Sequence, residues 1–472
     1  MQELYQYDEE YRDSIATVDE AGNRIWIYPK KPQGRLHNLR IVVTVILLAV
    51  LFSGPFIKIN GQPLLLMNFF ERKFIILGQA FWPQDFILFG LAMITFFVFV
   101  ILFTTAFGRL WCGWACPQTL FMEMVFRKIE YWIEGDANKQ RKLNAAPWTT
   151  DKITKKVGKQ LIFVAISVLI GHLMMAYLIG IEEVKVVISH GPSAHLSGFL
   201  GLIFFSSVFY GVFAYFREQA CTVVCPYGRL QGVLLNKDSI VVAYDWLRGE
   251  PRGKLKKQES DTQQGDCIDC KLCVHACPTG IDIRHGTQLE CVNCTACIDA
   301  CDQVMEKIDK PQGLIRYDSY NGIAENQKIQ YGARLVGYTA VLVALLGLLG
   351  YLLVSRSDVE ATVLRVPGQL FQRTEEGNIT NLFNVQFVNK TFDEMPLELR
   401  LMDKPNAHIE KVGGEAVVVP SNDMVEGVYF IEIPAHELGE TKTTLVLGVF
   451  SNGKLIEKVK TSFLGPIKTG IK

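Results

Sequence analysis

The sequence lacks an excess of charge of either sign. Among its 472 residues, Lys and Arg together number 48, Asp and Glu also number 48, and the formal net charge is therefore zero. A chain without net positive charge has no general attraction for a polyanion, which argues against a nucleic-acid partner. Hydrophobic residues make up 49% of the chain, and they gather in long uncharged runs. This segregation is typical of a membrane protein, whose first partner is lipid.

Cysteine is absent from the last part of the chain. All twelve cysteines lie between Cys112 and Cys301, so thiol chemistry is confined to one region. A secretory signal is also missing, because the N-terminal residues are acidic and polar and contain no basic segment before an apolar core and no twin arginine. Residues 1–38 are therefore predicted to form a cytoplasmic segment.

Five apolar runs are long enough to cross a bilayer, at residues 39–56, 86–107, 157–180, 196–216 and 333–354. Basic residues precede the first run and are frequent in the loop 108–156, which predicts that these sides are cytoplasmic. Five spans then place residues 355–472 in the periplasm of a bacterial inner membrane. The connection between the first two spans is predicted to be an interfacial loop with aromatic and basic anchors: Phe69, Phe70, Arg72, Lys73 and Trp82.

The C-terminal region changes character after the last span. Alternating apolar runs, such as residues 383–388, 428–433 and 445–450, are separated by Gly, Pro and Asn. About seven such strands over about 110 residues predict an immunoglobulin-like β-sandwich. No cluster of ionisable residues there resembles an active site, so a spacing module and a partner-docking domain both stay open.

Eight cysteines form two copies of the spacing C-x2-C-x2-C-x3-C. This spacing is typical of 4Fe–4S ligands, and the fourth cysteine of each copy binds the other cluster. One cluster is expected on Cys267, Cys270, Cys273 and Cys301, and the other on Cys277, Cys291, Cys294 and Cys297. The motif predicts a bacterial-ferredoxin-like domain at about residues 260–310, within a cytoplasmic segment, 217–332.

Zinc sites and a disulfide framework are the competing interpretations of these eight cysteines. A cytoplasmic position disfavours disulfides, and the spacing is unlike that of zinc sites. His275 and His285 lie in the same region, but all eight thiolate positions are filled without them. We therefore interpret both as surface histidines.

A second repeat contains the remaining four cysteines. Cys112 and Cys116 follow the second span, Cys221 and Cys225 follow the fourth, and a proline comes directly after each pair. On a continuing helix, residues i and i+4 face the same way, so each pair is expected to present two sulfurs at the cytoplasmic boundary. The pairs either share one four-sulfur site or act as separate dithiol couples, and soft thiolates favour Cu(I).

Other polar or soft side chains lie near these spans. Met122 and Met124 offer thioethers near the first pair, although methionines on an apolar face more often serve packing. His172 lies inside the third span, where an ionisable residue is a functional candidate by default. A haem held by His172 with His190 or His195 is not supported by the helical spacing.

In these motifs, the sequence resembles the cytochrome c oxidase accessory protein G family, also called the nitrogen-fixation G or cupric reductase family. The resemblance covers most of the chain and includes the C-terminal domain. It implies reduction of Cu(II) to Cu(I) during assembly of cbb3-type cytochrome oxidase, with Cys112, Cys116, Cys221 and Cys225 as the catalytic copper site. In the expected mechanism, a cytosolic donor passes one electron through the two clusters to copper, and thiolates stabilise Cu(I).

Two other functions stay open. The same cysteine pairs and ferredoxin motif occur in quinol-oxidising subunits of nitrate reductase systems, where a quinol site would lie between spans. The third function is an assembly scaffold whose clusters are structural. The added C-terminal domain favours the accessory family, which implies a copper chaperone or oxidase assembly factors as partners and leaves a homodimer open.

Overall fold

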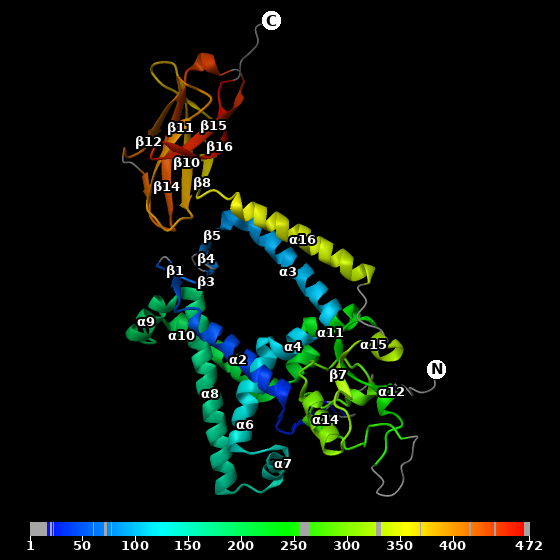
Figure 1. The fold of residues 1–472 in the computed structure, drawn as a ribbon. Coiled ribbons are helices and arrows are strands. Elements are labelled where there is room, and N and C mark those ends of the chain that lie inside the picture. The colour runs from blue at the N-terminus through cyan, green and yellow to red at the C-terminus, as the bar shows by residue number, and fades with distance from the viewer. Residues whose placement is uncertain are drawn as a thin grey trace. The chain divides into compact units, whose positions relative to one another are not determined.

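The computed structural model describes residues 17–18, 21, 23–59, 61–69, 73–76, 78–254, 264–326, 332–368, 370–414, 417–438 and 440–466. The chain forms two compact units, each built from two stretches of sequence (Figure 1). The first unit is Met1–Pro55 with Leu91–Gly347, and the second is Phe56–Gly90 with Leu348–Lys472.

Five helices are long and apolar enough to cross a membrane, as the sequence predicts. They are α2 (Arg35–Ser53), α3 (Phe86–Phe107), α8 (Thr150–Ile179), α10 (Leu196–Gly211) with its π-helical extension η3 (Val212–Phe216), and α16 (Ala333–Val354). Helix α8 begins before the apolar run because the side chain of Thr149 accepts a hydrogen bond from the backbone N–H of Lys152 and caps it. A helix starts at its cap, whereas hydropathy marks only the edge of the hydrocarbon.

Helices α8 and α10 lie side by side in the first unit (Figure 1). Gly171 allows a close approach, since a Cβ atom at this position would lie 2.4 Å from the Ser206 Oγ of α10. After α8, the short helix α9 (Ile181–His190) leads back to α10. The large apolar side chains exposed on α3 and α16 are those that a lipid environment covers.

Short helices follow the two spans that precede the cysteine pairs. After α3 come α4 (Leu110–Trp114), α5 (Pro117–Leu120), the π-helix η2 (Phe121–Phe126), α6 (Arg127–Ile133) and α7 (Ala137–Ala145). After η3 come the π-helix η4 (Ala220–Val224) and α11 (Pro226–Leu234). π-Helical turns are rare and occur frequently at functional sites.

The cysteine-rich part of the first unit is built around one small antiparallel sheet. Strands β6 (Val241–Tyr244) and β7 (Ile315–Asp318) pair, and they enclose α12 (Trp246–Gly249), α13 (Leu272–Ala276), η5 (Ile283–His285) and α14 (Ala296–Lys307), with α15 (Tyr320–Glu325) after β7. The carboxylate of Asp299 on α14 accepts hydrogen bonds from the backbone N–H groups of Leu36 (3.1 Å) and His37 (2.7 Å). It thereby caps the N-terminus of α2 and joins this part to a membrane helix.

The C-terminal part of the second unit contains the predicted immunoglobulin-like sandwich. One sheet has the order β12-β14-β10-β8 with β9 on β10, and the other has the order β13-β11-β15-β16. The strands are β8 (Val359–Arg365), β9 (Gln372–Arg373), β10 (Ile379–Asn389), β11 (Met395–Leu401), β12 (His408–Lys411), β13 (Val417–Val419), β14 (Met424–Ile433), β15 (Lys442–Ser451) and β16 (Lys454–Leu464), and η6 (Ala435–Glu437) follows β14. Alternate residues of the strands fill a core that includes Phe383, Ile431 and Leu447.

The connection between the first two spans is not the plain loop that the sequence predicts. It folds into a hairpin, β1 (Lys58–Ile59) with β2 (Gln62–Pro63), and a sheet of β3 (Leu65–Asn68), β4 (Lys73–Ile76) and β5 (Gln79–Phe81), followed by η1 (Pro83–Asp85). The Trp82 indole donates to Asn422 Oδ1 at 3.3 Å instead of standing free as an anchor. Phe70, Arg72 and the Lys73 side chain lie outside the described residues.

A buried carboxylate fixes this small sheet to the C-terminal sandwich. Asp85 pairs with Arg356 at 2.5 Å and with Lys390 at 2.7 Å, and its side chain is 6% exposed. The connection after α2 and the domain after α16 therefore lie on the same side of the membrane. Four crossings, by α3, α8, α10 and α16, return the chain to that side, which agrees with five spans.

Candidate metal centres and thiol site

Two cavities in the cysteine-rich part are lined by the predicted iron ligands. One is lined by Cys277, Cys291, Cys294 and Cys297, and Cys273 of the other set also reaches it. The other is lined by Cys267, Cys270, Cys273 and Cys301. The structure thus brings together the two crossed sets that the motif spacing suggests, and all twelve cysteines are free thiols. The ligation itself stays a prediction.

The two motif copies share an unusual backbone conformation. Asp269 and Lys271 in the first copy, and Asn293 and Thr295 in the second, have positive φ angles of 50°, 56°, 53° and 65°. Such angles are uncommon outside glycine and cluster at functional sites. In the second copy, the backbone N–H groups of Asn293 and Ala296 point to the sulfurs of Cys291 and Cys294. Donors aimed at sulfur favour the thiolate form that iron requires.

Buried donors without acceptors lie near the cavity that Cys291 and Cys294 line. Among the described residues, Arg40 Nη2, Arg109 Nε and Asn293 Nδ2 have no hydrogen-bond partner. The charge of Arg40 lowers the pKa of Cys294, and that of Arg109 lowers the pKa of Cys291, although burial raises both pKa values overall. An anionic iron–sulfur centre supplies the acceptors that these groups lack. The residues present therefore fit 4Fe–4S clusters.

The second cysteine of each Cys-x3-Cys pair lies at a break between two helices. Helix α4 ends at Trp114, and Cys116 has φ −61° and ψ 124° before Pro117 opens α5. Cys225 has φ −69° and ψ 114° before Pro226 opens α11. Proline excludes the helical conformation at the residue before it, which makes the predicted continuing helix wrong.

The two pairs are nevertheless held next to each other. Arg109 donates to the carbonyl of Gly228, after the second pair, and Gln118 after the first pair donates to the carbonyl of Arg217 at 3.3 Å. The thiols of Cys112 and Cys221 interact electrostatically, and both interact with Cys225. Among the described residues, no three His, Cys, Asp or Glu side chains are close enough to bind one ion.

Burial controls the protonation of this thiol site. Burial raises the pKa of Cys112 to about 11 and that of Cys221 to about 12. A hydrogen bond from Gln231 opposes this effect at Cys112, where Nε2 lies 3.3 Å from Sγ. The thiols are therefore neutral at pH 7 until a cation compensates the charge of the thiolate.

The first pair packs directly against the second iron motif. Cys112 contacts the cluster of buried residues that contains Val292 and Cys294. A Cβ atom on Gly113 would lie 2.5 Å from the carbonyl oxygen of Val292 and 2.6 Å from that of Asn293, so only glycine permits this approach. Sequence reasoning missed Gly113 and Gln231, and only the position of Gly113 between two cysteines offered a signal.

The methionines suggested as extra soft ligands are buried on η2. Met122 is 3% exposed and Met124 is 6% exposed. Glu123, between them, pairs with Arg127 at 2.8 Å. Sequence reasoning missed the buried ion pairs nearby. Arg127 also pairs with Glu218, while Glu130 pairs with Arg217 and Lys159.

The fold and the cysteine geometry define a multi-pass membrane protein with a 4Fe–4S dicluster domain and an immunoglobulin-like domain. Family profiles agree, because residues 216–320 match a "4Fe-4S dicluster domain", residues 89–139 match a "4Fe-4S binding domain", and residues 349–466 match the "IG-like fold at C-terminal of FixG". The description of the last profile provisionally groups FixG with the oxidoreductases.

Curated relatives match along most of the chain. Protein RdxB of Cereibacter sphaeroides is 33% identical over 442 residues, which cover 89% of this chain and 92% of the relative. Nitrogen fixation protein FixG of Rhizobium meliloti is 32% identical over 435 residues, with coverages of 83% and 81%. The chain belongs to the FixG/RdxB family, which confirms the resemblance seen in the sequence.

Among solved structures, a FixG-related protein from Vibrio parahaemolyticus can be aligned with this chain at 17% identity and a TM-score of 0.20. The alignment covers 23% of this chain and 97% of the Vibrio chain. The fold assignment does not depend on this similarity.

The profile over residues 89–139 contains only two cysteines, Cys112 and Cys116. Iron ligation by these cysteines is therefore an alternative that any experiment on the thiol site must separate from copper binding.

Proposed function

We propose that this protein is an oxidoreductase that reduces Cu(II) to Cu(I) at Cys112, Cys116, Cys221 and Cys225, for the assembly of cbb3-type cytochrome oxidase. The observation that carries the proposal is the packing of Cys112 against the buried residues around Cys294. This contact brings the half-buried thiol of Cys112 next to residues that line a cavity of predicted iron ligands. It supports a short path for an electron from a cluster in that cavity to copper bound at the thiol pairs.

In this proposal, one set of cysteines binds the clusters that supply electrons, and another set binds copper. The two crossed sets of four cysteines would hold two 4Fe–4S clusters, which supply single electrons, the number that reduction of Cu(II) to Cu(I) requires. Thiolates are soft ligands and favour Cu(I) over Cu(II), so ligation stabilises the product. Gln231 donates a hydrogen bond to the sulfur of Cys112. Arg109, before the first cysteine pair, donates to the carbonyl of Gly228, after the second pair.

We further propose that the cysteine-rich part faces the cytoplasm and the sandwich faces the periplasm of a bacterial inner membrane. The basic residues of α7 and of the first turns of α8 support this orientation. A cytosolic electron donor would then reach the clusters, and a copper chaperone or an oxidase assembly factor would take the product. The fixed contact of Asp85 with the sandwich is compatible with that arrangement.

Metal analysis and copper reduction on anaerobically purified full-length protein test the proposal. We expect the dithionite-reduced wild type to convert Cu(II) to Cu(I), detected with a Cu(I)-specific chelator, after excess dithionite has been removed. Serine at Cys112 and Cys221 should abolish this conversion and copper binding, while iron stays at about eight atoms per chain, as two four-iron clusters require. Thr222→Ala, between Cys221 and Cys225, is the matched control.

Two results contradict the proposed copper site. Loss of iron in the Cys112→Ser or Cys221→Ser variant places these cysteines among the cluster ligands. If the variant with all four cysteines replaced by serine still reduces Cu(II) at the wild-type rate, the reaction does not take place at these cysteines. Electron paramagnetic resonance of the reduced protein separates these outcomes, because it reports the clusters independently of copper turnover.

A further inference from the structure

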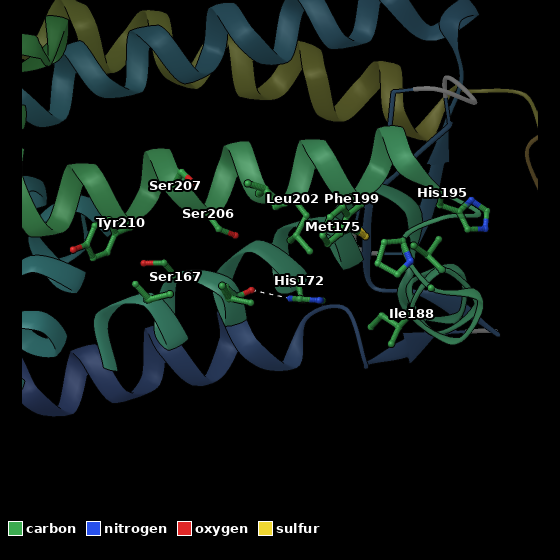
Figure 2. Close-up of a pocket in the computed structure, with 16 residues that line it drawn as sticks. Ser167, His172, Met175, Ile188, His195, Phe199, Leu202, Ser206, Ser207 and Tyr210 are labelled. Carbon is green, nitrogen blue, oxygen red and sulfur yellow. Dashed lines mark hydrogen bonds between the residues drawn. The ribbon is translucent and has the colours of Figure 1, made fainter. Parts of the chain in front are cut away.

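A cavity of about 470 Å³ lies between α8, α9 and α10, within the part of the chain that crosses the membrane (Figure 2). Its size is within the range of small-molecule pockets. Most of its wall is apolar, with Val164, Met175, Ile188, Phe199 and Leu202 among the lining residues. Because two membrane spans form the wall, the ligand that reaches it is one that dissolves in lipid.

One buried hydroxyl in this wall has no partner. Ser206 on α10 is 7% exposed, and its Oγ makes no hydrogen bond with any described residue. The Oγ packs closely against Gly171 of the facing helix, where a Cβ atom would lie only 2.4 Å from it. A buried hydroxyl without a partner is unfavourable, which indicates that a ligand completes the site.

The histidine in the same wall is set up to accept a hydrogen bond. Nδ1 of His172 lies 2.8 Å from the carbonyl oxygen of Val168. A carbonyl oxygen only accepts, so Nδ1 carries the proton, and Nε2 of the neutral ring is left as an acceptor. Figure 2 shows His172 and Ser167 on α8 across from Ser206 on α10.

We infer that this cavity binds the head group of an isoprenoid quinone or quinol. Such a ring carries oxygens on opposite sides, so a hydroxyl donates to His172 Nε2 while a ring oxygen pairs with Ser206 Oγ. The apolar wall suits the ring and the first part of its tail. A phospholipid acyl chain fills the volume but leaves both polar groups unpaired. This binding site goes beyond the proposed copper chemistry and does not depend on it.

Binding of decylubiquinone to delipidated full-length protein in detergent, measured by titration calorimetry, tests the inference. We expect saturable binding with one molecule per chain in the wild type. Ser206→Ala and His172→Leu each remove one hydrogen bond, which should weaken binding about twofold to tenfold. The two variants together should lose more than either alone.

Matched controls use the same residue types on neighbouring positions. His190 has the same local bond, with Nδ1 2.8 Å from the Val186 carbonyl oxygen, but it is not among the residues that line the cavity. Ser197 is an exposed serine on α10. His190→Leu and Ser197→Ala should therefore bind decylubiquinone like the wild type.

Undiminished binding in both Ser206→Ala and His172→Leu overturns the inference. Displacement of decylubiquinone by an equal concentration of dioleoylphosphatidylcholine also overturns it, because the cavity is then a lipid site. Copper reduction by the dithionite-reduced wild type is measured separately and needs no quinone. Failure of quinone binding and failure of the proposed function are therefore distinguishable.

Discussion

The indole N–H of Trp114 donates to the hydroxyl of Tyr317 across 2.9 Å, and this hydroxyl donates in turn to the carbonyl of Asn293 across 3.0 Å. Trp114 lies between Cys112 and Cys116, and Asn293 lies between Cys291 and Cys294. Two hydrogen bonds thus connect a cysteine pair at the membrane with an iron motif far away in sequence. Tyr317, which neither motif contains, sets their relative position.

Removal of the Tyr317 hydroxyl should destabilise this junction. In Tyr317→Phe, the Trp114 N–H and the Asn293 carbonyl lose their partner in a half-buried position, which costs about 1–3 kcal/mol. We expect the visible absorbance of the iron–sulfur clusters to disappear at a lower temperature on heating. Tyr320→Phe is the control, because the Tyr320 side chain is 44% exposed. If both variants lose the cluster absorbance at the same temperature, the two hydrogen bonds of Tyr317 contribute nothing to the stability of the junction.

A methyl group at Gly113 should separate the thiol pair from the iron motif. Gly113→Ala places a Cβ atom within 2.6 Å of two backbone carbonyl oxygens, at Val292 and Asn293, and neither can move alone. We expect copper reduction by the cluster-reduced protein to slow at least tenfold, while iron content and cluster spectra persist. Gly90→Ala, where no atom lies within 4 Å of the new Cβ, is the control. An unchanged rate in Gly113→Ala contradicts the assigned contact.

The ion pairs of Asp85 should hold the small sheet on the sandwich. Asp85→Ala leaves Arg356 and Lys390 without this partner in a buried position, a loss of about 3–5 kcal/mol that the remaining pair of Lys390 with Glu360 reduces. The thermal transition of the sandwich in the full-length protein should fall. Glu398→Gln breaks an exposed pair with Arg400 and should leave the transition where it is.

The stability of the sandwich should depend on pH through Glu457. Burial raises the pKa of this carboxyl from 4.5 to about 7, and the nearby charge of Glu360 acts in the same direction, whereas Lys390 and the Ala361 N–H oppose it. Because the folded pKa is the higher one, the stabilisation is fully present below about pH 4.5 and is lost as the pH rises through 7.

Glu457→Gln removes this titration, since an amide keeps an acceptor for the Ala361 N–H without becoming charged. The melting temperature of the sandwich in the wild type should fall between pH 5 and pH 7.5, and this part of the fall should be absent from the variant. Parallel melting curves of the two proteins over that range contradict the raised pKa. Glu410→Gln, on the exposed edge strand β12, serves as the control.

Local patterns allowed much of the fold to be predicted. A membrane span depends on the hydropathy of about twenty consecutive residues, so α3 and α16 have the bounds that the apolar runs suggest. The strands of the sandwich follow from alternation with period two. The small sheet at residues 58–81 escaped prediction because its strands are too short to show a period. The break at Cys116 was readable in principle, since Pro117 excludes a helical conformation before it.

The sequence by itself determined the chemistry of this protein: the number and spacing of its cysteines, the five spans and the C-terminal sandwich, all of which are properties of neighbouring residues. Only the tertiary structure decided that Cys112 lies against the motif of Cys294, that Asp85 joins the sandwich, and that Ser206 faces a cavity without a partner. Contacts between distant residues depend on how helices and sheets pack, and single-sequence spacing carries no information about that packing.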